Sequence, residues 1–271
     1  MTRKVETGTD QLLCAVDDHV ATITFNRPEK RNALGDIVSP ALREILLTLD
    51  RDRDVRVIVI TGAGKAFCSG GDVSGMGSGI GPKAPPEDRV RDLQRKQQTL
   101  TLRLHELSKP TIASLPGAAA GAGMSIALAC DLRIAAESAF LVTGFGRVGL
   151  SGDYGGSWFL TQLVGPAKAK ELYLTGRRVP AAEALALGLV NMVVPDDSLA
   201  EESAALARQI ANGPPLAQRF MKENINRALN VDLRTCLGWE AERTIASAAT
   251  ADHKEAVAAF MEKRAPVFRG E

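Results

Sequence analysis

Residues 109–132 read KPTIASLPGAAAGAGMSIALACDL and carry the strongest local signals in this chain of 271 residues. Thr111–Leu115 is typical of a buried strand, and it stops at the turn-forming pair Pro116-Gly117. A helix of very small residues is predicted to follow, which lets a ligand approach the backbone closely. The first amides of such a helix have no partner within it, so they can stabilise negative charge on a ligand oxygen. The alternative is that these glycines only permit tight turns and helix packing.

A second glycine-rich stretch, KAFCSGGDV at residues 65–73, follows the predicted strand Val55–Ile60. One backbone amide from each of the two loops would together make an oxyanion hole. Taken singly, either loop is explained better by turn geometry and helix packing alone. The functional interpretation therefore depends on both loops occurring in one chain.

The composition is that of a globular protein, with 45% hydrophobic and 24% charged residues and a net charge of +1. These fractions exclude disordered and fibrous classes, and the length corresponds to one or two domains. Balanced charge and 4% aromatic residues argue against a nucleic-acid partner. The N-terminal MTRKVETGTDQ lacks an apolar core and no stretch suits a bilayer, so we expect a cytoplasmic protein without a membrane partner. The four scattered cysteines are expected to be reduced thiols.

Strand-like and helix-like patterns alternate in the first part of the chain. Strands are predicted at 20–25, 55–60, 111–115, 132–135 and 139–143, and helices at 35–50 and 89–107. Beyond residue 155 the pattern is almost all helical, with starts near 155, 166, 180, 198, 214 and 231, a last helix at 252–264 and one strand at 189–194. This order predicts an α/β core over residues 1–200 and a helical C-terminal region over 201–271.

Several common motifs are incomplete in this sequence. GAGK at 62–65 follows a strand but lacks the third glycine of a dinucleotide fingerprint and the ending of a P-loop. GLSGD at 149–153 lacks the last glycine of a nucleophile elbow. His19, His105 and His253 are isolated, so structural or solvated roles are expected for them and no metal site is predicted.

Six blocks of sequence carry a resemblance that spans nearly the whole chain. They are NRPEKRNAL (26–34), VRVIVITGAGKAFCSGGDV (55–73), KPTIASLPGAAAGAGMSIALACDLRIAAESAF (109–140), VGLSGDYGGSWFLTQLVG (148–165), ALALGLVNMVV (184–194) and DHKEAVAAFMEKRAPVF (252–268). In this order they closely resemble the enoyl-CoA hydratase/isomerase (crotonase) superfamily. The resemblance implies an α/β fold built as a spiral of ββα turns, with a helical C-terminal region that assembles trimers or dimers of trimers. It also implies an acyl-CoA thioester as substrate, with coenzyme A as part of that substrate and no separate cofactor.

The resemblance also implies roles for individual residues. The thioester oxygen would be held by the backbone amides of Gly71 and Ala122, where the enolate formed during reaction is stabilised. Phe260 and Lys263 match positions that reach the nucleotide end of coenzyme A from a neighbouring subunit. The other matched coenzyme A positions are Arg27, Lys30 and Arg31 for the phosphates, and Ala66, Ser69, Gly70, Asp72 and Val73 around the adenine. A solvated turn explains the three basic residues equally well.

The sequence departs from the hydratases of this superfamily at their two glutamates. The matching positions hold Ser125 and Phe145, neither of which supplies an ordinary acid–base group near neutral pH. Asp153 lies in GLSGDYGGSW (149–158), which resembles members that shift a double bond with a single aspartate. Apolar neighbours such as Phe145 and Trp158 would raise its pKa toward the working pH. We therefore predict an enoyl-CoA isomerase with Asp153 as the acid–base group.

Four alternatives stay open at this point. Asp153 could simply cap the helix predicted to start at Gly155. It could act as a nucleophile in hydrolysis or dehalogenation, as in a related subgroup of the superfamily. It could activate water by itself in a hydratase that lacks the usual glutamates. The chain could also bind acyl-CoA without catalysing any reaction.

Overall fold

The strands of the protein form two sheets, as shown by a computed structural model that describes residues 2–72 and 85–271. The larger sheet has the order β1-β2-β3-β4-β6-β8-β11 and the smaller one β10-β9-β7-β5. In the larger sheet the strands are β1 (Arg3–Lys4), β2 (Leu12–Asp17), β3 (Val20–Phe25), β4 (Val57–Gly62), β6 (Thr111–Leu115), β8 (Leu132–Ala136) and β11 (Met192–Val194). In the smaller sheet they are β5 (Ala66–Cys68), β7 (Ala118–Ala120), β9 (Phe140–Val142) and β10 (Val179–Pro180).

The order of elements along the chain is a repeated strand–strand–helix unit. The pairs β4–β5, β6–β7 and β8–β9 each place one strand in the larger sheet and the next in the smaller sheet, before the chain enters a helix. Strands β3, β4, β6, β8 and β11 run parallel to one another. Parallel strands are covered on both faces and therefore have nearly continuous apolar sequences, as VIVITG in β4 and TIASL in β6 show.

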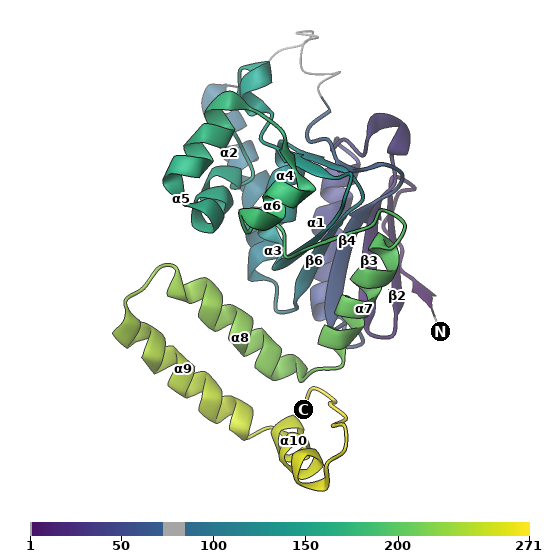
Figure 1. Ribbon diagram of the computed structural model, residues 1–271, viewed down its shortest axis with the longest axis vertical. Helices are drawn as coiled ribbons and strands as arrows, with labels where there is room; N and C mark the ends of the chain where they lie inside the picture. Colours follow the sequence, from purple (N-terminus) through teal and green to yellow (C-terminus); the bar gives the residue numbers. More distant parts are fainter. Residues whose placement is uncertain (1, 73–84) are drawn as a thin grey trace.

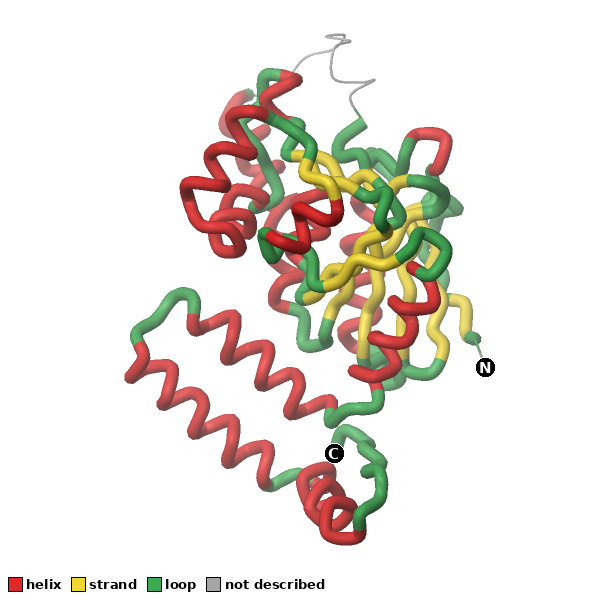
Figure 2. Tube along the Cα trace, viewed as in Figure 1, coloured by secondary structure: helices red, strands yellow, loops and turns green. Residues whose placement is uncertain are grey.

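Helices cover the two sheets and continue beyond them (Figure 2). The α-helices are α1 (Val38–Arg51), α2 (Pro86–Gln97), α3 (Arg103–Glu106), α4 (Ala122–Ala129), α5 (Gly156–Thr175), α6 (Ala181–Ala186), α7 (Leu199–Ala211), α8 (Pro215–Ala228), α9 (Leu233–Ala248) and α10 (Ala251–Glu262). A π-helical segment, η3 (Gln98–Leu102), joins α2 to α3, and short 3₁₀ turns lie at η1 (Pro28–Lys30) and η4 (Phe145–Val148). Amphipathic α1 shows the usual cause of such packing, because it buries Leu42, Leu46 and Leu49 against the core.

The predicted α/β class is confirmed, and most predicted elements lie within two or three residues of the observed ones. The predicted helix starts at 155 and 166 correspond to one helix, α5, which kinks at Gly165 with φ 75° and ψ 165° just before Pro166. The strands β1, β2, β5, β7 and β10 were not predicted. Alanine-rich β7 has the composition of a helix start and none of the β-branched residues that mark strands.

Helices α8, α9 and α10 extend away from the two sheets, whereas α7 packs against β3, β4, β6 and β8 (Figure 1). The predicted division at residue 200 falls at the start of α7, and the division into core and C-terminal region stays a prediction. All four cysteines are free thiols. No helix in the described part of the chain is both long and apolar enough to cross a membrane.

Candidate active site

Two glycine-rich loops meet at the carboxyl ends of β5 and β7. Gly70 has φ +89°, and a Cβ at this position would lie 2.8 Å from the Ala120 carbonyl oxygen and 3.4 Å from the Ala122 nitrogen. A Cβ on Gly123 would overlap the Cys68 carbonyl. Only glycine fits at both positions, so the backbones of the two loops approach as closely as backbones can.

The amides of Gly71 and Ala122 both lie at this junction. Gly71 forms a parallel bridge with Leu34, in which the Leu34 amide donates to the Gly70 carbonyl over 2.7 Å and the Asp72 amide donates to the Leu34 carbonyl over 2.9 Å. These bonds leave the Gly71 N–H pointing away from Leu34. Ala122 is the first residue of α4, where a helix has no internal partner for the N–H group. The structure thus brings together two backbone donors that the sequence places 51 residues apart.

Buried Asn32 organises the neighbouring turn, and sequence reasoning missed it. Its Nδ2 donates to the carbonyls of Ala63 (2.9 Å) and Ala66 (2.7 Å), and its Oδ1 accepts from the Arg27 amide at 2.9 Å. Its φ of 57° is a left-handed conformation that asparagine tolerates better than most residues. The asparagine that follows two basic residues in NRPEKRNAL was the available signal. Through these hydrogen bonds, the Asn32 side chain links the turn after β3 to the loop between β4 and β5.

The predicted coenzyme A residues of the first two blocks lie close together around this turn. The Arg27 guanidinium donates to the Ala33 carbonyl over 2.8 Å and pairs with Asp72 at 3.3 Å. The Ser69 amide donates a hydrogen bond to the Arg31 carbonyl over 3.0 Å, and the Ser69 hydroxyl donates one to the Lys30 carbonyl over 3.3 Å. The side chains of Lys30 and Arg31 are exposed, and Ala66 is buried in β5. Val73 lies outside the described residues.

Phe260 and Lys263 are not brought to this turn within one chain. Phe260 lies on α10 with 83% of its surface exposed, and Lys263 ends that helix with φ 56°. Helix α10 lies at the opposite end of the molecule from α2 and α5 (Figure 1). The contact of these two residues with the nucleotide end of coenzyme A in a neighbouring subunit stays a prediction.

Asp153 lies in the loop that leads into α5, and this loop is tied to α4. The Ser125 hydroxyl donates to the Asp153 carbonyl over 3.1 Å and also contacts the Gly121 carbonyl at 3.3 Å. The Tyr154 amide donates to Gln97 Oε1 over 3.1 Å, which fixes the same loop to the end of α2. Ser125 lies one turn after Ala122, so the loop bearing Asp153 is held beside the helix end that carries one of these two amides.

The Asp153 carboxylate does not cap α5. Gly155 is the residue that precedes the helix, and the Asp153 backbone carbonyl, not its side chain, accepts from the Gly156 amide at 3.2 Å. Asp153 Oδ1 is buried and has no hydrogen-bond partner among the described residues. Burial alone raises the pKa of this carboxyl to about 6. The carboxylate is therefore available for proton transfer near neutral pH.

Tyr173, which sequence analysis did not single out, closes the space behind Asp153. Its ring stacks nearly parallel on Phe145, with centroids 6.2 Å apart and an interplanar angle of 10°. Its hydroxyl lies 2.7 Å from where a Cβ on Gly156 would be, and no described residue bonds it. Burial and the nearby Asp153 charge raise the pKa of Tyr173 to about 12, so it stays a neutral donor. The kink at Gly165 lies between Tyr173 and Asp153 along the chain.

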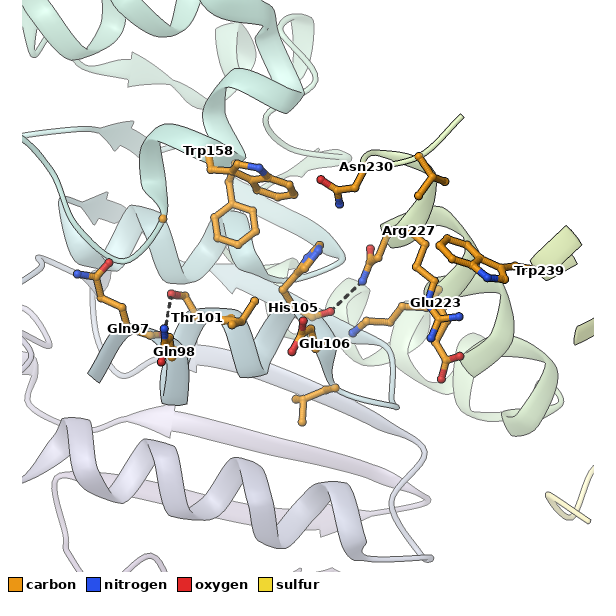
Figure 3. A pocket seen from close by; sticks show the side chains of 17 residues that line it. Gln97, Gln98, Thr101, His105, Glu106, Trp158, Glu223, Arg227, Asn230 and Trp239 are labelled. Carbon is orange, nitrogen blue, oxygen red and sulfur yellow. Dashed lines mark hydrogen bonds between the residues drawn. The ribbon is translucent and has the colours of Figure 1, made fainter. Parts of the chain in front are cut away.

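A cavity of about 650 Å³ opens beside the start of α5 (Figure 3). Gln97 and Gly155 form part of its wall next to the Asp153 loop, and Trp158 lies in its wall with 37% of its surface exposed. His105, expected to be structural or solvated, also lines this cavity, and burial lowers its pKa. The full lining is Gln97, Gln98, Thr101, Leu102, His105, Glu106, Leu107, Gly155, Trp158, Phe159, Lys222, Glu223, Asn226, Arg227, Asn230, Val231 and Trp239.

Comparison with known proteins identifies relatives along the whole chain. The sequence profile of the family described as enoyl-CoA hydratase/isomerase matches residues 16–271. The 1,2-epoxyphenylacetyl-CoA isomerase of Escherichia coli is 38% identical over 259 residues, 96% of this chain and 98% of the relative. The short-chain-enoyl-CoA hydratase of Clostridium acetobutylicum is 35% identical, over 90% of this chain and 92% of its own. The crystal structure of an enoyl-CoA hydratase from Bacillus anthracis superposes with a TM-score of 0.90 at 36% identity, covering 97% and 100% of the two chains.

Proposed function

The chain belongs to the enoyl-CoA hydratase/isomerase family, and we propose that it shifts a carbon–carbon double bond along the acyl chain of an enoyl-CoA thioester. The observation that carries this proposal is the half-buried carboxylate of Asp153, with one oxygen free of partners, in a loop fastened to the amide end of α4. The two positions that hold glutamates in the resembling hydratases are Ser125 and Phe145, so one carboxylate has to act alone. Isomerisation needs only one, because the same group removes and returns a proton.

The reaction follows from the positions of these groups. With a 3-enoyl-CoA, the Asp153 carboxylate removes a proton from the carbon next to the thioester carbonyl. The electron pair of that C–H bond delocalises into a dienolate, whose oxygen accepts from the amides of Gly71 and Ala122. Protonated Asp153 then returns the proton to the far end of the dienolate, which gives the conjugated 2-enoyl-CoA and restores the carboxylate. Atoms and charge balance without a cofactor beyond the coenzyme A of the substrate.

The proposal places coenzyme A along the turn that Asn32 organises. Lys30 and Arg31 offer exposed cations for phosphate oxygens, and Arg27 orients Asp72 beside them. Ser69 and Gly70 border the path from this turn to the Gly71 amide. Together with Ala66 and Val73, these are the residues that the resemblance assigns to coenzyme A.

Self-association through the C-terminal helices is part of the proposal. Helices α8, α9 and α10 expose large apolar side chains over the part of the molecule that contacts the core least (Figure 1). These side chains are Met221, Ile225, Leu229, Leu233, Leu237, Ile245, Val257, Phe260 and Met261. A trimer, or a dimer of trimers, would bury them and would bring Phe260 and Lys263 toward a neighbouring coenzyme A.

The test of the proposed activity compares 3-enoyl-CoA with 2-enoyl-CoA esters of several lengths. We expect 3-enoyl-CoA to gain the ultraviolet absorbance of the conjugated thioester as the double bond moves. Loss of absorbance from 2-enoyl-CoA with uptake of water would instead identify a hydratase. In isotopically labelled water, a released acid that carries a solvent oxygen would identify hydrolysis instead of isomerisation. Acyl-CoA binding with no exchange of the proton next to the carbonyl in heavy water would mean a non-catalytic protein.

The isomerase rate should depend on pH through Asp153. The base form is needed for proton removal, and burial raises the pKa of Asp153 to about 6. We therefore expect kcat/KM for 3-enoyl-CoA to rise with pH through about 6 and to level off above it, since kcat/KM reports groups of the free enzyme. A profile with no change between pH 5 and 7 would contradict the assignment.

A further inference from the structure

The cavity beside α5 has no role in the proton transfer described above, yet it adjoins the residues that carry it. Gly155 and Gln97 line the cavity, and both also belong to the Asp153 loop or hold it in place. The cavity therefore lies next to the loop that carries Asp153. A volume of about 650 Å³ is within the range of cavities that bury a ligand.

The part of the wall nearest Asp153 is a cluster of three aromatic rings. His105 lies edge to face with Trp158 and with Phe159, with ring centroids 5.5 Å apart in both pairs. Trp158 and Phe159 meet edge to face at 5.1 Å. Figure 3 shows Trp158 and the rings beneath it facing the cavity from one side, with Arg227 and Trp239 on the other.

Three charged side chains at the far wall already have partners. Lys222 forms an ion pair with Asp131 at 2.8 Å, and Glu223 pairs with Arg219 at 2.8 Å and with Arg243 at 2.7 Å. The Arg227 guanidinium lies over the Trp239 ring, 5.1 Å from its centroid. Because Lys222 and Glu223 already have ion-pair partners, this wall suits a neutral acyl group better than a charged one.

We propose that this cavity receives the acyl end of the substrate and selects acyl groups that carry an aromatic ring. The inference rests on the proposed function for the direction in which the acyl group leaves Asp153. An aromatic ligand ring can join the edge-to-face arrangement of His105, Trp158 and Phe159, with its polarised edge toward a ring face. An alkyl chain gains no such contact, and it would face the amide side chains of Gln98, Asn226 and Asn230, which line the same cavity.

The experiment measures binding of unreactive saturated thioesters by calorimetry. Phenylpropionyl-CoA, cyclohexylpropionyl-CoA and nonanoyl-CoA have equal carbon numbers and differ in ring and aromaticity. We expect the phenyl ester to bind about fivefold more tightly than the straight-chain ester, with the cyclohexyl ester between them. Trp158→Leu should bring the three affinities to within about twofold of one another. Trp158→Phe keeps a ring and should keep the preference.

Phe140→Leu is the matched control, because Phe140 is an aromatic residue outside the cavity that packs under the Arg178 guanidinium at 4.5 Å. It should leave the order of affinities unchanged. Equal binding of the three esters by the wild-type protein would overturn the proposal, as would a preference that survives Trp158→Leu. Because these esters do not react, a failure of the isomerase proposal would show in turnover alone and leave this binding order intact.

Discussion

Replacing Asp153 by asparagine should lower kcat for isomerisation by about 10³-fold while leaving the affinity for a saturated acyl-CoA within about twofold of wild type. Asparagine keeps the shape of the side chain but cannot accept or return a proton. The contacts that hold the loop, from the Ser125 hydroxyl to the Asp153 carbonyl and from the Tyr154 amide to Gln97, involve backbone atoms of the loop and survive the change. The rate of isomerisation and calorimetric binding of butyryl-CoA measure the two effects separately.

The same substitution should make the protein more stable at neutral pH. The folded-state pKa of Asp153 is raised to about 6 from an ordinary value of 3.8, so between these values the folded protein binds more protons than the unfolded chain. The free energy of unfolding therefore falls as pH rises through that interval. Asparagine removes this penalty, and after allowing for solvent screening we expect a gain of about 1–2 kcal/mol at pH 8 and none near pH 3.

Asp196→Asn is the matched control for this prediction. Asp196 is an exposed carboxylate that accepts from the Ser138 amide at 3.0 Å, and this bonding lowers its pKa. Its replacement should leave isomerisation unchanged and should not stabilise the fold. Full activity in Asp153→Asn would remove Asp153 from the mechanism, and loss of acyl-CoA binding in that variant would assign it a binding role instead.

Proline at position 122 should lower kcat by about 10²–10³-fold, because it removes one of the two amides proposed to hold the thioester oxygen. Ala122 is the first residue of α4, where proline is tolerated since its missing N–H has no partner within the helix. The change therefore deletes a donor with little effect on the helix. Single-turnover rates with 3-enoyl-CoA, together with thermal unfolding, separate lost catalysis from lost folding.

Ala251→Pro makes the same change at the first residue of α10. Thr250 before it has φ −76° and ψ 157°, a conformation compatible with a following proline. This control should fold and should keep the wild-type rate. A normal rate in Ala122→Pro would show that the Ala122 amide does not bind the reacting oxygen.

The strands and helices that could be predicted are those whose buried apolar residues recur in the sequence with the period of a strand or a helix. Apolar, β-branched runs located β3 and β6, and helical spacing of leucines located α1. The smaller sheet was missed because β5 and β7 are three residues long, and at β7 every residue is alanine. Their pairing depends on contacts between distant segments, which no local pattern records.

The backbone amides of the candidate site were easier to predict from the sequence than the side chains around them. The glycine-rich composition pointed to the two loops, and the family resemblance assigned Gly71, Ala122 and Asp153. Tyr173 and His105 carry no motif, and each reaches the site through tertiary packing, Tyr173 after the bend at Gly165 and His105 from α3. The apolar face of a helix can be recognised in a sequence, but the segment that packs against this face cannot.

The close packing around Ser125 restricts which side chains this position can hold, and therefore which reaction substituted variants could catalyse. A longer acidic side chain at position 125 would extend into space already filled by the Gly156 backbone and the Tyr173 hydroxyl, which lies 2.7 Å from where a Gly156 Cβ would be. An acidic side chain at position 145 would lose the ring that stacks on Tyr173. A route from the proposed double-bond migration to water addition by two glutamates would therefore need substitutions at positions 125, 145 and 173.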